Sequence, residues 1–142
     1  MNYTELIDTF GNRIGIEGLA FSKNGSCSVS FDDDELIFEL NGNRLFVISD
    51  IDIAEDESEA LHRVMLEGNH FGHKTGFSCL GLDRRTGSYT LSRVFEGEIE
   101  IETFMKEIEL FVRALRYWKQ YLNGGTTEQK EEFSFPTNVI FP

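Results

Sequence analysis

The segment 101–122 is the feature that most restricts how this chain can fold. Its apolar residues recur every three or four positions, which is the period of a helix with one buried face. A helix of roughly six turns with a single apolar side needs a second layer of structure to cover that side. The sequence therefore predicts a long amphipathic helix packed on other elements. Its apolar positions are Ile101, Phe104, Met105, Ile108, Phe111, Val112, Leu115, Trp118 and Leu122.

Earlier in the chain the apolar period changes to two, which is typical of a β-strand with one buried face. In residues 26–31 the apolar side chains alternate with serines. Residues 35–53 predict a hairpin with its turn at 41–43, because the Asn-Gly-Asn sequence there accepts the positive φ that such a turn needs. Two further strands are predicted over 76–83 and 87–95.

Two shorter helices complete the predicted order. The first starts at the N-terminus, where Asn2 or Thr4 can cap it. The second spans 54–69 and has acidic residues in its first turn, where the helix dipole favours them. The predicted order is helix, three strands, helix, two strands and helix, which is an α+β fold. We expect one domain over 1–125 and a flexible C-terminal tail over 126–142.

The predicted hairpin carries apolar residues on both of its faces. Leu36 and Phe38 belong to one face, whereas Ile37, Phe46 and Ile48 remain on the opposite side. A sheet with one buried face would carry polar residues there. The surplus apolar surface favours contact with another protein, with ordinary packing in the core or in a dimer as the alternative for each residue.

The net charge of −12 indicates which partners suit the chain. Residues 1–70 hold 15 acidic against 4 basic side chains, and residues 71–142 hold 10 against 9. Such a field repels nucleic acid and attracts a basic partner. No signal peptide and no membrane-spanning run is recognisable, so we expect a soluble cytosolic protein. The cysteines, Cys27 and Cys79, have the spacing of neither a metal nor a redox motif and predict two buried thiols.

A search for chemical motifs predicts no enzyme. His62, Glu67, His70 and His73 are the candidate metal ligands, but HxxH with glycines beside it does not fix a site. We interpret 67–76 as a polar joint between a helix and a strand, with a metal site as the alternative. The acidic run after Asp50 lacks the ligand pattern and the glycine of an EF-hand. No phosphate-binding loop or nucleophile elbow is present, so we predict no catalytic residue, metal or cofactor.

Three stretches of the sequence carry a resemblance to a known family. They are "IGIEGLAFSKNGSCSVSFDD" (14–33), "GFSCLGLDRRTGSYTL" (76–91) and "FMKEIELFVRALRYWKQYL" (104–122). Together with the order of elements and the acidic composition, they resemble the class I type III secretion chaperones, typified by the chaperone of the translocated intimin receptor. The resemblance covers residues 1 to about 122. It implies a twisted antiparallel sheet packed against helices.

The resemblance also implies a homodimer whose interface is supplied largely by the second helix. That helix corresponds to 57–67 here, with Leu61, Val64 and Met65 as the expected contacts. The implied partner is the extended N-terminal segment of a secreted effector, which the dimer keeps soluble and ready for export in the bacterial cytoplasm. The secretion apparatus is a further implied partner, and no nucleic acid or membrane takes part.

The effector would bind in apolar grooves by strand addition and by pockets for its side chains. We expect Leu6 and Phe10 of the first helix, and Ile37, Phe46 and Ile48 of the hairpin, to contact it. The alternative within the same family is a chaperone-like regulator, which controls expression of the secretion genes by binding a small protein partner.

Overall fold

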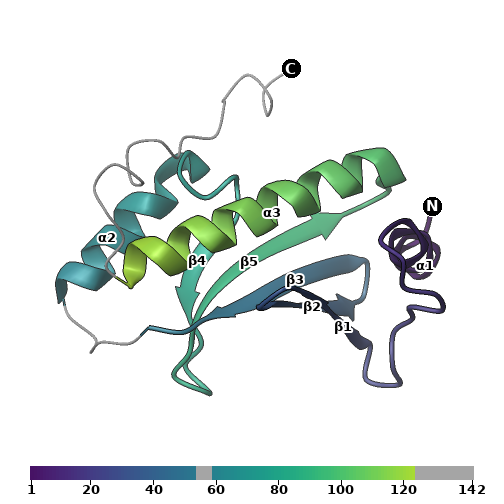
Figure 1. The fold of residues 1–142 in the computed structure, drawn as a ribbon, viewed down its shortest axis with the longest axis horizontal. Helices are drawn as coiled ribbons and strands as arrows, with labels where there is room; N and C mark the ends of the chain where they lie inside the picture. Colours follow the sequence, from purple (N-terminus) through teal and green to yellow (C-terminus); the bar gives the residue numbers. More distant parts are fainter. Residues whose placement is uncertain (54–58, 124–142) are drawn as a thin grey trace. The chain divides into compact units, whose positions relative to one another are not determined.

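The computed structural model describes residues 1–53 and 59–123 and has the predicted order of elements (Figure 1). The strands form a five-stranded sheet in the order β1-β2-β3-β5-β4, so β1 and β4 are its edges. The fold is α+β, as predicted. The helices and strands are α1 (Tyr3–Arg13), β1 (Ser26–Phe31), β2 (Asp34–Asn41), β3 (Arg44–Ile51), α2 (Glu59–Asn69), the 3-10 helix η1 (His70–Gly72), β4 (Cys79–Leu82), β5 (Tyr89–Glu96) and α3 (Ile101–Leu122).

The described residues divide into two compact units. The first holds 1–49 and 94–109, and the second holds 50–53, 59–93 and 110–123. The expected tail over 126–142 and the start of the predicted second helix, 54–58, lie outside the described residues.

In the first unit, α1 starts where the sequence predicts. Asn2 caps it, because its side-chain oxygen accepts a hydrogen bond from the Glu5 backbone N–H at 2.8 Å. The helix continues past Gly11 to Arg13, although a glycine there predicts an earlier end. A β-carbon on Gly11 would lie 2.7 Å from both the Ile16 carbonyl oxygen and Leu19 Cβ, so the glycine lets the following loop pack closely on the helix.

Strands β1, β2 and β3 form the predicted antiparallel meander. Gly42 stands in the β2–β3 turn with φ +62°, which confirms the predicted hairpin. Leu36, Phe38 and Val47 point to one face and are fully buried. The period of two therefore places the predicted core residues of the hairpin correctly.

A cluster of phenylalanines joins α1, the sheet and the start of α3. The Phe10 ring centroid lies 5.3 Å from that of Phe104 on α3 and 5.8 Å from that of Phe38 on β2. Phe95 on β5 lies 5.4 Å from Phe104 by the same measure. These edge-to-face contacts are the favoured geometry for aromatic pairs, and they form the core of the first unit.

In the second unit, Trp118 of α3 organises the packing. Its side chain is 1% exposed, and its indole N–H donates to the Lys74 carbonyl at 2.7 Å. A β-carbon on Gly68 would lie 2.6 Å from Trp118 Cζ2, so α2 approaches the indole ring closely only because residue 68 is glycine. The segment from Asn69 to Ser78, which includes η1, replaces the start of the strand predicted at 76.

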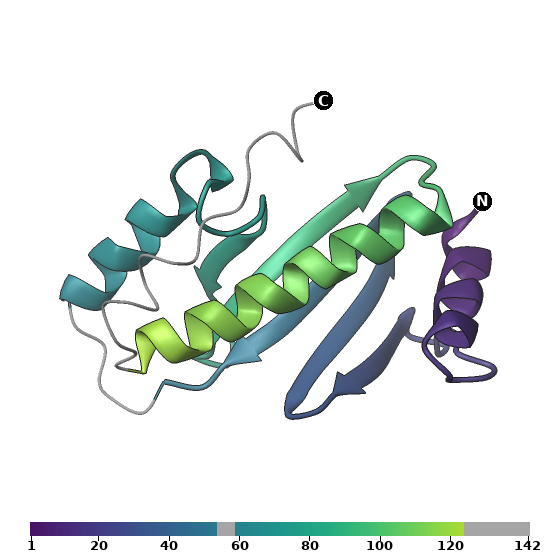
Figure 2. The ribbon, with the colours of Figure 1, turned by 45° about the horizontal axis from the view of Figure 1, so that its top comes forward.

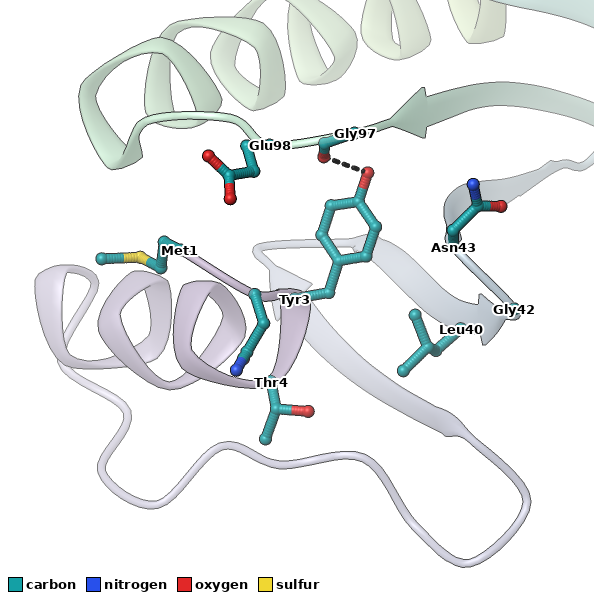
Figure 3. A pocket seen from close by; sticks show the side chains of 9 residues that line it. Met1, Tyr3, Thr4, Leu40, Gly42, Asn43, Gly97 and Glu98 are labelled. Carbon is teal, nitrogen blue, oxygen red and sulfur yellow. Dashed lines mark hydrogen bonds between the residues drawn. The ribbon is translucent and has the colours of Figure 1, made fainter.

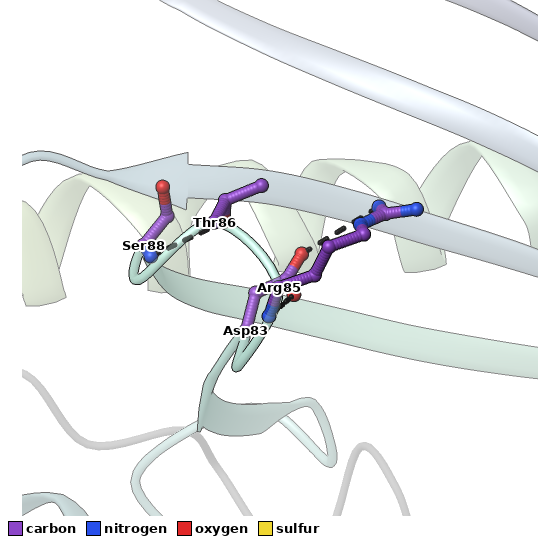
Figure 4. Close-up of polar contacts among 4 residues, drawn as sticks. All are labelled: Asp83, Arg85, Thr86 and Ser88. Carbon is purple, nitrogen blue, oxygen red and sulfur yellow. Dashed lines mark hydrogen bonds and ion pairs between the residues drawn. The ribbon is translucent and has the colours of Figure 1, made fainter.

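The connection between β4 and β5 is a hairpin whose side chains bond to its own backbone (Figure 4). Asp83 Oδ1 accepts a hydrogen bond from the Arg85 backbone N–H at 2.9 Å, and Thr86 Oγ1 accepts one from the Ser88 N–H at 3.2 Å. Gly87 takes a φ of +76° between them. Side chains of the turn thus stabilise its backbone locally, which explains its Asp, Thr and Gly residues.

Candidate functional site: a partner-binding surface

The surface of interest is the outer face of β2 and β3, opposite the core. Ile37 pairs directly with Ile48 across the two strands, and Phe46 lies two residues before Ile48 on the same face. All three side chains are half-buried. The structure therefore brings the predicted hairpin residues together as one cluster outside the core.

Val94 of β5 adds to this cluster and was not predicted. Arg44 at the start of β3 forms an ion pair with Glu96, and β3 and β5 run in opposite directions (Figure 2). Two residues after Arg44 on β3 and two residues before Glu96 on β5 stand Phe46 and Val94, so these side chains are near neighbours on the outer face. Val94 is 46% exposed. We name Ile37, Phe46, Ile48 and Val94 the outer apolar patch.

Carboxylates surround the outer apolar patch. Glu35 and Glu39 stand on either side of Ile37 along the same face of β2, and Glu96 stands next to Val94 on β5. All three are exposed. The first unit holds 14 acidic and 4 basic residues, so this face lies in the most acidic part of the described chain. Its chemistry suits an apolar segment that carries basic residues.

Leu6 and Phe10 of α1 belong to the core of the first unit. Leu6 is 0% exposed and Phe10 is 1% exposed, because both pack in the core of the first unit. A side chain that is fully covered by its own domain offers no area to a partner. Their predicted contact with an effector stays a prediction, separate from the outer apolar patch.

The β1 edge offers backbone groups to a partner. Ser22 N–H donates to the Ser26 carbonyl at 2.8 Å, so the backbone groups of Ser26 turn away from β2. Ser28 and Ser30 share this orientation, because backbone direction alternates along a strand. Within 1–53 and 59–123, no backbone group bonds to the outward N–H and C=O groups of Ser28 and Ser30.

The predicted dimer contacts of α2 differ in how far they are exposed. Leu61 and Val64 are half-buried, and Met65 is 6% exposed because it packs within the second unit. Leu66 is 71% exposed and lines a hollow of about 560 Å³ together with Glu59, Ala60, His62 and Arg63. Leu66 directly follows Val64 and Met65 in the sequence of α2, and spacing alone does not tell which of these apolar residues stays uncovered.

His62 contacts Tyr89, whereas His70 and His73 share a different aromatic neighbour. His62 Nε2 lies 3.0 Å from the Tyr89 hydroxyl, while the His70 and His73 rings both contact Phe71, with centroid distances of 4.3 Å and 6.2 Å. Within the described residues, no three His, Cys, Asp or Glu side chains come together as a metal site requires.

The predicted burial of both thiols is wrong, because Cys27 is half-buried and Cys79 is exposed, on the face of β4 opposite to buried Leu80.

A second hollow of about 370 Å³ lies beside the start of α1 (Figure 3). The Tyr3 hydroxyl donates to the Gly97 carbonyl at 2.8 Å at its wall. Burial, with a smaller effect from Glu96, raises the pKa of Tyr3, so the phenol stays protonated and remains a donor. This hydrogen bond ties α1 to the loop before α3.

None of the helices in the described part of the chain combines the length and the apolar character that crossing a membrane requires.

Comparison with known proteins gives the chain a family. Residues 5–119 match the sequence profile of the Tir chaperone protein (CesT) family. The Chlamydia pneumoniae protein CPj0713/CpB0740 is 33% identical over 69 residues, which are 49% of this chain and 52% of that protein. The matched region thus spans about half the length of this curated relative.

Solved structures share the fold. A chain of the ExsC–ExsE complex matches with a TM-score of 0.74 and 22% identity, over 89% of this chain and 100% of that one. A chain of the HopA1–SchA chaperone–effector complex matches with a TM-score of 0.68 and 21% identity, over 82% and 92%. A chain of the complex between the Yersinia pestis type III secretion chaperone SycH and a YscM2 fragment matches at 0.64 and 17%, over 81% and 98%. Since the family profile spans most of the residues and the fold agrees, the chain belongs to the Tir chaperone protein (CesT) family.

Proposed function

We propose that this protein is a type III secretion chaperone, which binds the extended N-terminal segment of a secreted effector and keeps it soluble and ready for export. The observation that carries the proposal is the outer apolar patch, a group of apolar side chains outside the core with carboxylates around it. Family membership supports it, as do the chaperone–effector complexes among the proteins of similar fold.

Binding uses three features of the first unit. Apolar effector side chains cover Ile37, Phe46 and Ile48, and each fully buried one contributes about 1.5–3 kcal/mol. Basic effector residues face the surrounding carboxylates. An extended stretch of the effector adds to the β1 edge through backbone hydrogen bonds with Ser28 and Ser30. Holding the segment extended keeps its apolar residues from aggregating, and this needs neither catalysis nor a cofactor.

The chaperone acts as a homodimer in the bacterial cytoplasm and presents the effector to the secretion apparatus. Leu61, Val64 and Leu66 of α2 form the dimer contact in this proposal. Leu66 supports it, because an exposed leucine next to a hollow on the same helix gains from being covered by a second copy. Met65 takes an indirect part, since it fixes α2 on its own unit.

The test is to purify the tagged protein from its source cells, identify the protein that accompanies it and measure the mass of the complex by light scattering. We expect two copies of the chain with one copy of a secreted protein, bound through its N-terminal region. A small non-secreted regulator instead would favour the regulatory role. A protein that stays alone, or that carries a stoichiometric metal, would contradict the proposal.

Ser28→Pro tests strand addition at β1. Proline lacks the N–H that faces away from β2, so it leaves the β1–β2 hydrogen bonds intact while it removes one donor from the free edge. We expect a thermal unfolding midpoint close to that of the wild type and an affinity for the effector segment lower by at least about tenfold, measured by calorimetry.

Val29→Pro is the matched control, since the Val29 N–H turns towards Leu36 of β2. It should disrupt β1 itself and lower the unfolding midpoint. An undiminished affinity in Ser28→Pro would place the effector strand away from β1.

A further inference from the structure

The two edges of the sheet differ in whether their backbone groups are already bonded. Each edge strand presents every second residue outwards. On β4 the outward residues are Leu80 and Leu82, because Asp83 N–H donates to Ser88 of the neighbouring connection at 2.7 Å and the orientation alternates from there. The backbone of Leu80 would thus be open to a further strand.

Asn69, the last residue of α2, occupies that position instead. Its side-chain Nδ2 donates to the Leu80 carbonyl at 2.8 Å, and its Oδ1 accepts from the Leu80 N–H at 2.7 Å. A carboxamide carries the same donor and acceptor as a peptide group, so Asn69 bonds to Leu80 as one residue of an adjacent strand would.

The close approach of α2 fixes the amide in place. Gly68, directly before Asn69, is buried, and a β-carbon on it would lie 3.3 Å from Leu80 Cδ1 and still closer to Trp118. Asn69 keeps helical backbone angles, φ −74° and ψ −18°. The end of α2 is thus packed against β4, and this packing brings the Asn69 amide to Leu80.

We propose that the Asn69 side chain caps the β4 edge and keeps a second polypeptide strand from pairing with Leu80 and Leu82. Leu82 is 50% exposed, and no described backbone group bonds to its outward N–H or C=O, so the cap is the barrier on this short strand. The partner that the cap excludes is the β4 strand of a second copy, which is self-complementary in the antiparallel direction. The cap would confine strand addition to β1. This consequence rests on the proposed function, whereas the cap itself does not.

The test compares wild type, Asn69→Ala, Asn69→Asp and the double variant Asn69→Ala with Leu82→Pro. In Asn69→Ala we expect hydrogen exchange of the Leu80 amide to become at least about tenfold faster in dilute protein. We also expect light scattering to show masses that grow with concentration beyond those of the wild type. Asn69→Asp keeps the acceptor but has no donor, so both effects should be smaller.

Leu82→Pro separates a cap from a merely structural clamp. It removes an outward N–H needed for pairing and leaves the β4–β5 hydrogen bonds in place. The double variant should therefore return to wild-type masses while its Leu80 amide still exchanges fast. If Asn69→Ala keeps wild-type masses, or if Leu82→Pro fails to reverse its association, the proposal is wrong.

If Asn69→Ala does not fold, the same masses and exchange rates are compared between Asn69→Asp and the double variant Asn69→Asp with Leu82→Pro. No effector takes part in these measurements. A failure here therefore leaves the chaperone function standing, and a failure of the co-purification leaves the cap standing.

Discussion

Replacing Phe46 by aspartate should lower the affinity for the effector segment by at least about a hundredfold, because apolar anchors at the centre of an interface contribute about 2–4 kcal/mol each. Phe46 lies next to Ile48 on β3 and near Val94 of β5 in the outer apolar patch, and it takes no part in the core cluster. The new carboxylate would stand opposite Glu39 on β2 and repel it, and it would face the apolar residues of the partner. Calorimetry with the purified effector segment measures the loss.

The fold and the proposed dimer should survive this change. We expect the mass of the free protein to remain that of two chains and its unfolding midpoint to move little. Ile16→Asp is the matched control, since Ile16 is a 37% exposed apolar residue of the first unit that lies in a loop outside the patch. Wild-type affinity in Phe46→Asp, or an equal loss in Ile16→Asp, would contradict the assignment of the patch.

Gly68→Val should destabilise the protein by about 3 kcal/mol, a large part of the stability of a domain this size. The added side chain meets the Trp118 ring, which is buried and held by its hydrogen bond to Lys74, and therefore cannot move aside. The gain in helix propensity from glycine to valine is only about 0.4 kcal/mol, so the clash decides the sign. Denaturant unfolding measures the difference.

Gly81→Val is the control for this variant. A β-carbon on Gly81 would meet only Thr90 Oγ1, at an ordinary 3.6 Å, and valine favours a strand. We expect it to leave stability unchanged or slightly higher. In a double-mutant cycle, Gly68→Val with Trp118→Leu should cost less than the two changes added together, because the valine fills part of the space that the indole leaves. Additive costs would mean that the two residues do not clash.

The order of elements was predictable because each of them has a clear period of apolar residues. Segment 101–122 is α3 within the predicted bounds, and the hairpin turns at Gly42 as its Asn-Gly-Asn sequence indicates. The same periods gave the outer position of Ile37, Phe46 and Ile48. In such cases, local sequence alone decides which face a side chain joins.

What could not be predicted depends on contacts between distant segments. An apolar stripe on α1 does not reveal that Phe104, far along the chain, covers Phe10 and leaves it no surface for a partner. Val94 had a detectable signal, since it is an apolar residue on the polar side of its strand, yet its place beside Phe46 depends on the β3–β5 pairing. No local pattern shows that the amide of Asn69 reaches Leu80.

The alternation along β2 and β3 has an evolutionary consequence. The core contains Leu36, Phe38 and Val47. The side chains that alternate with them along the same strands lie outside the core, and they are Ile37, Phe46 and Ile48. Substitutions on the outer face can thus accumulate with little loss of stability. A lineage that acquires a new effector can therefore change its binding residues at these positions. The core residues encoded in the same short stretch of gene stay unchanged.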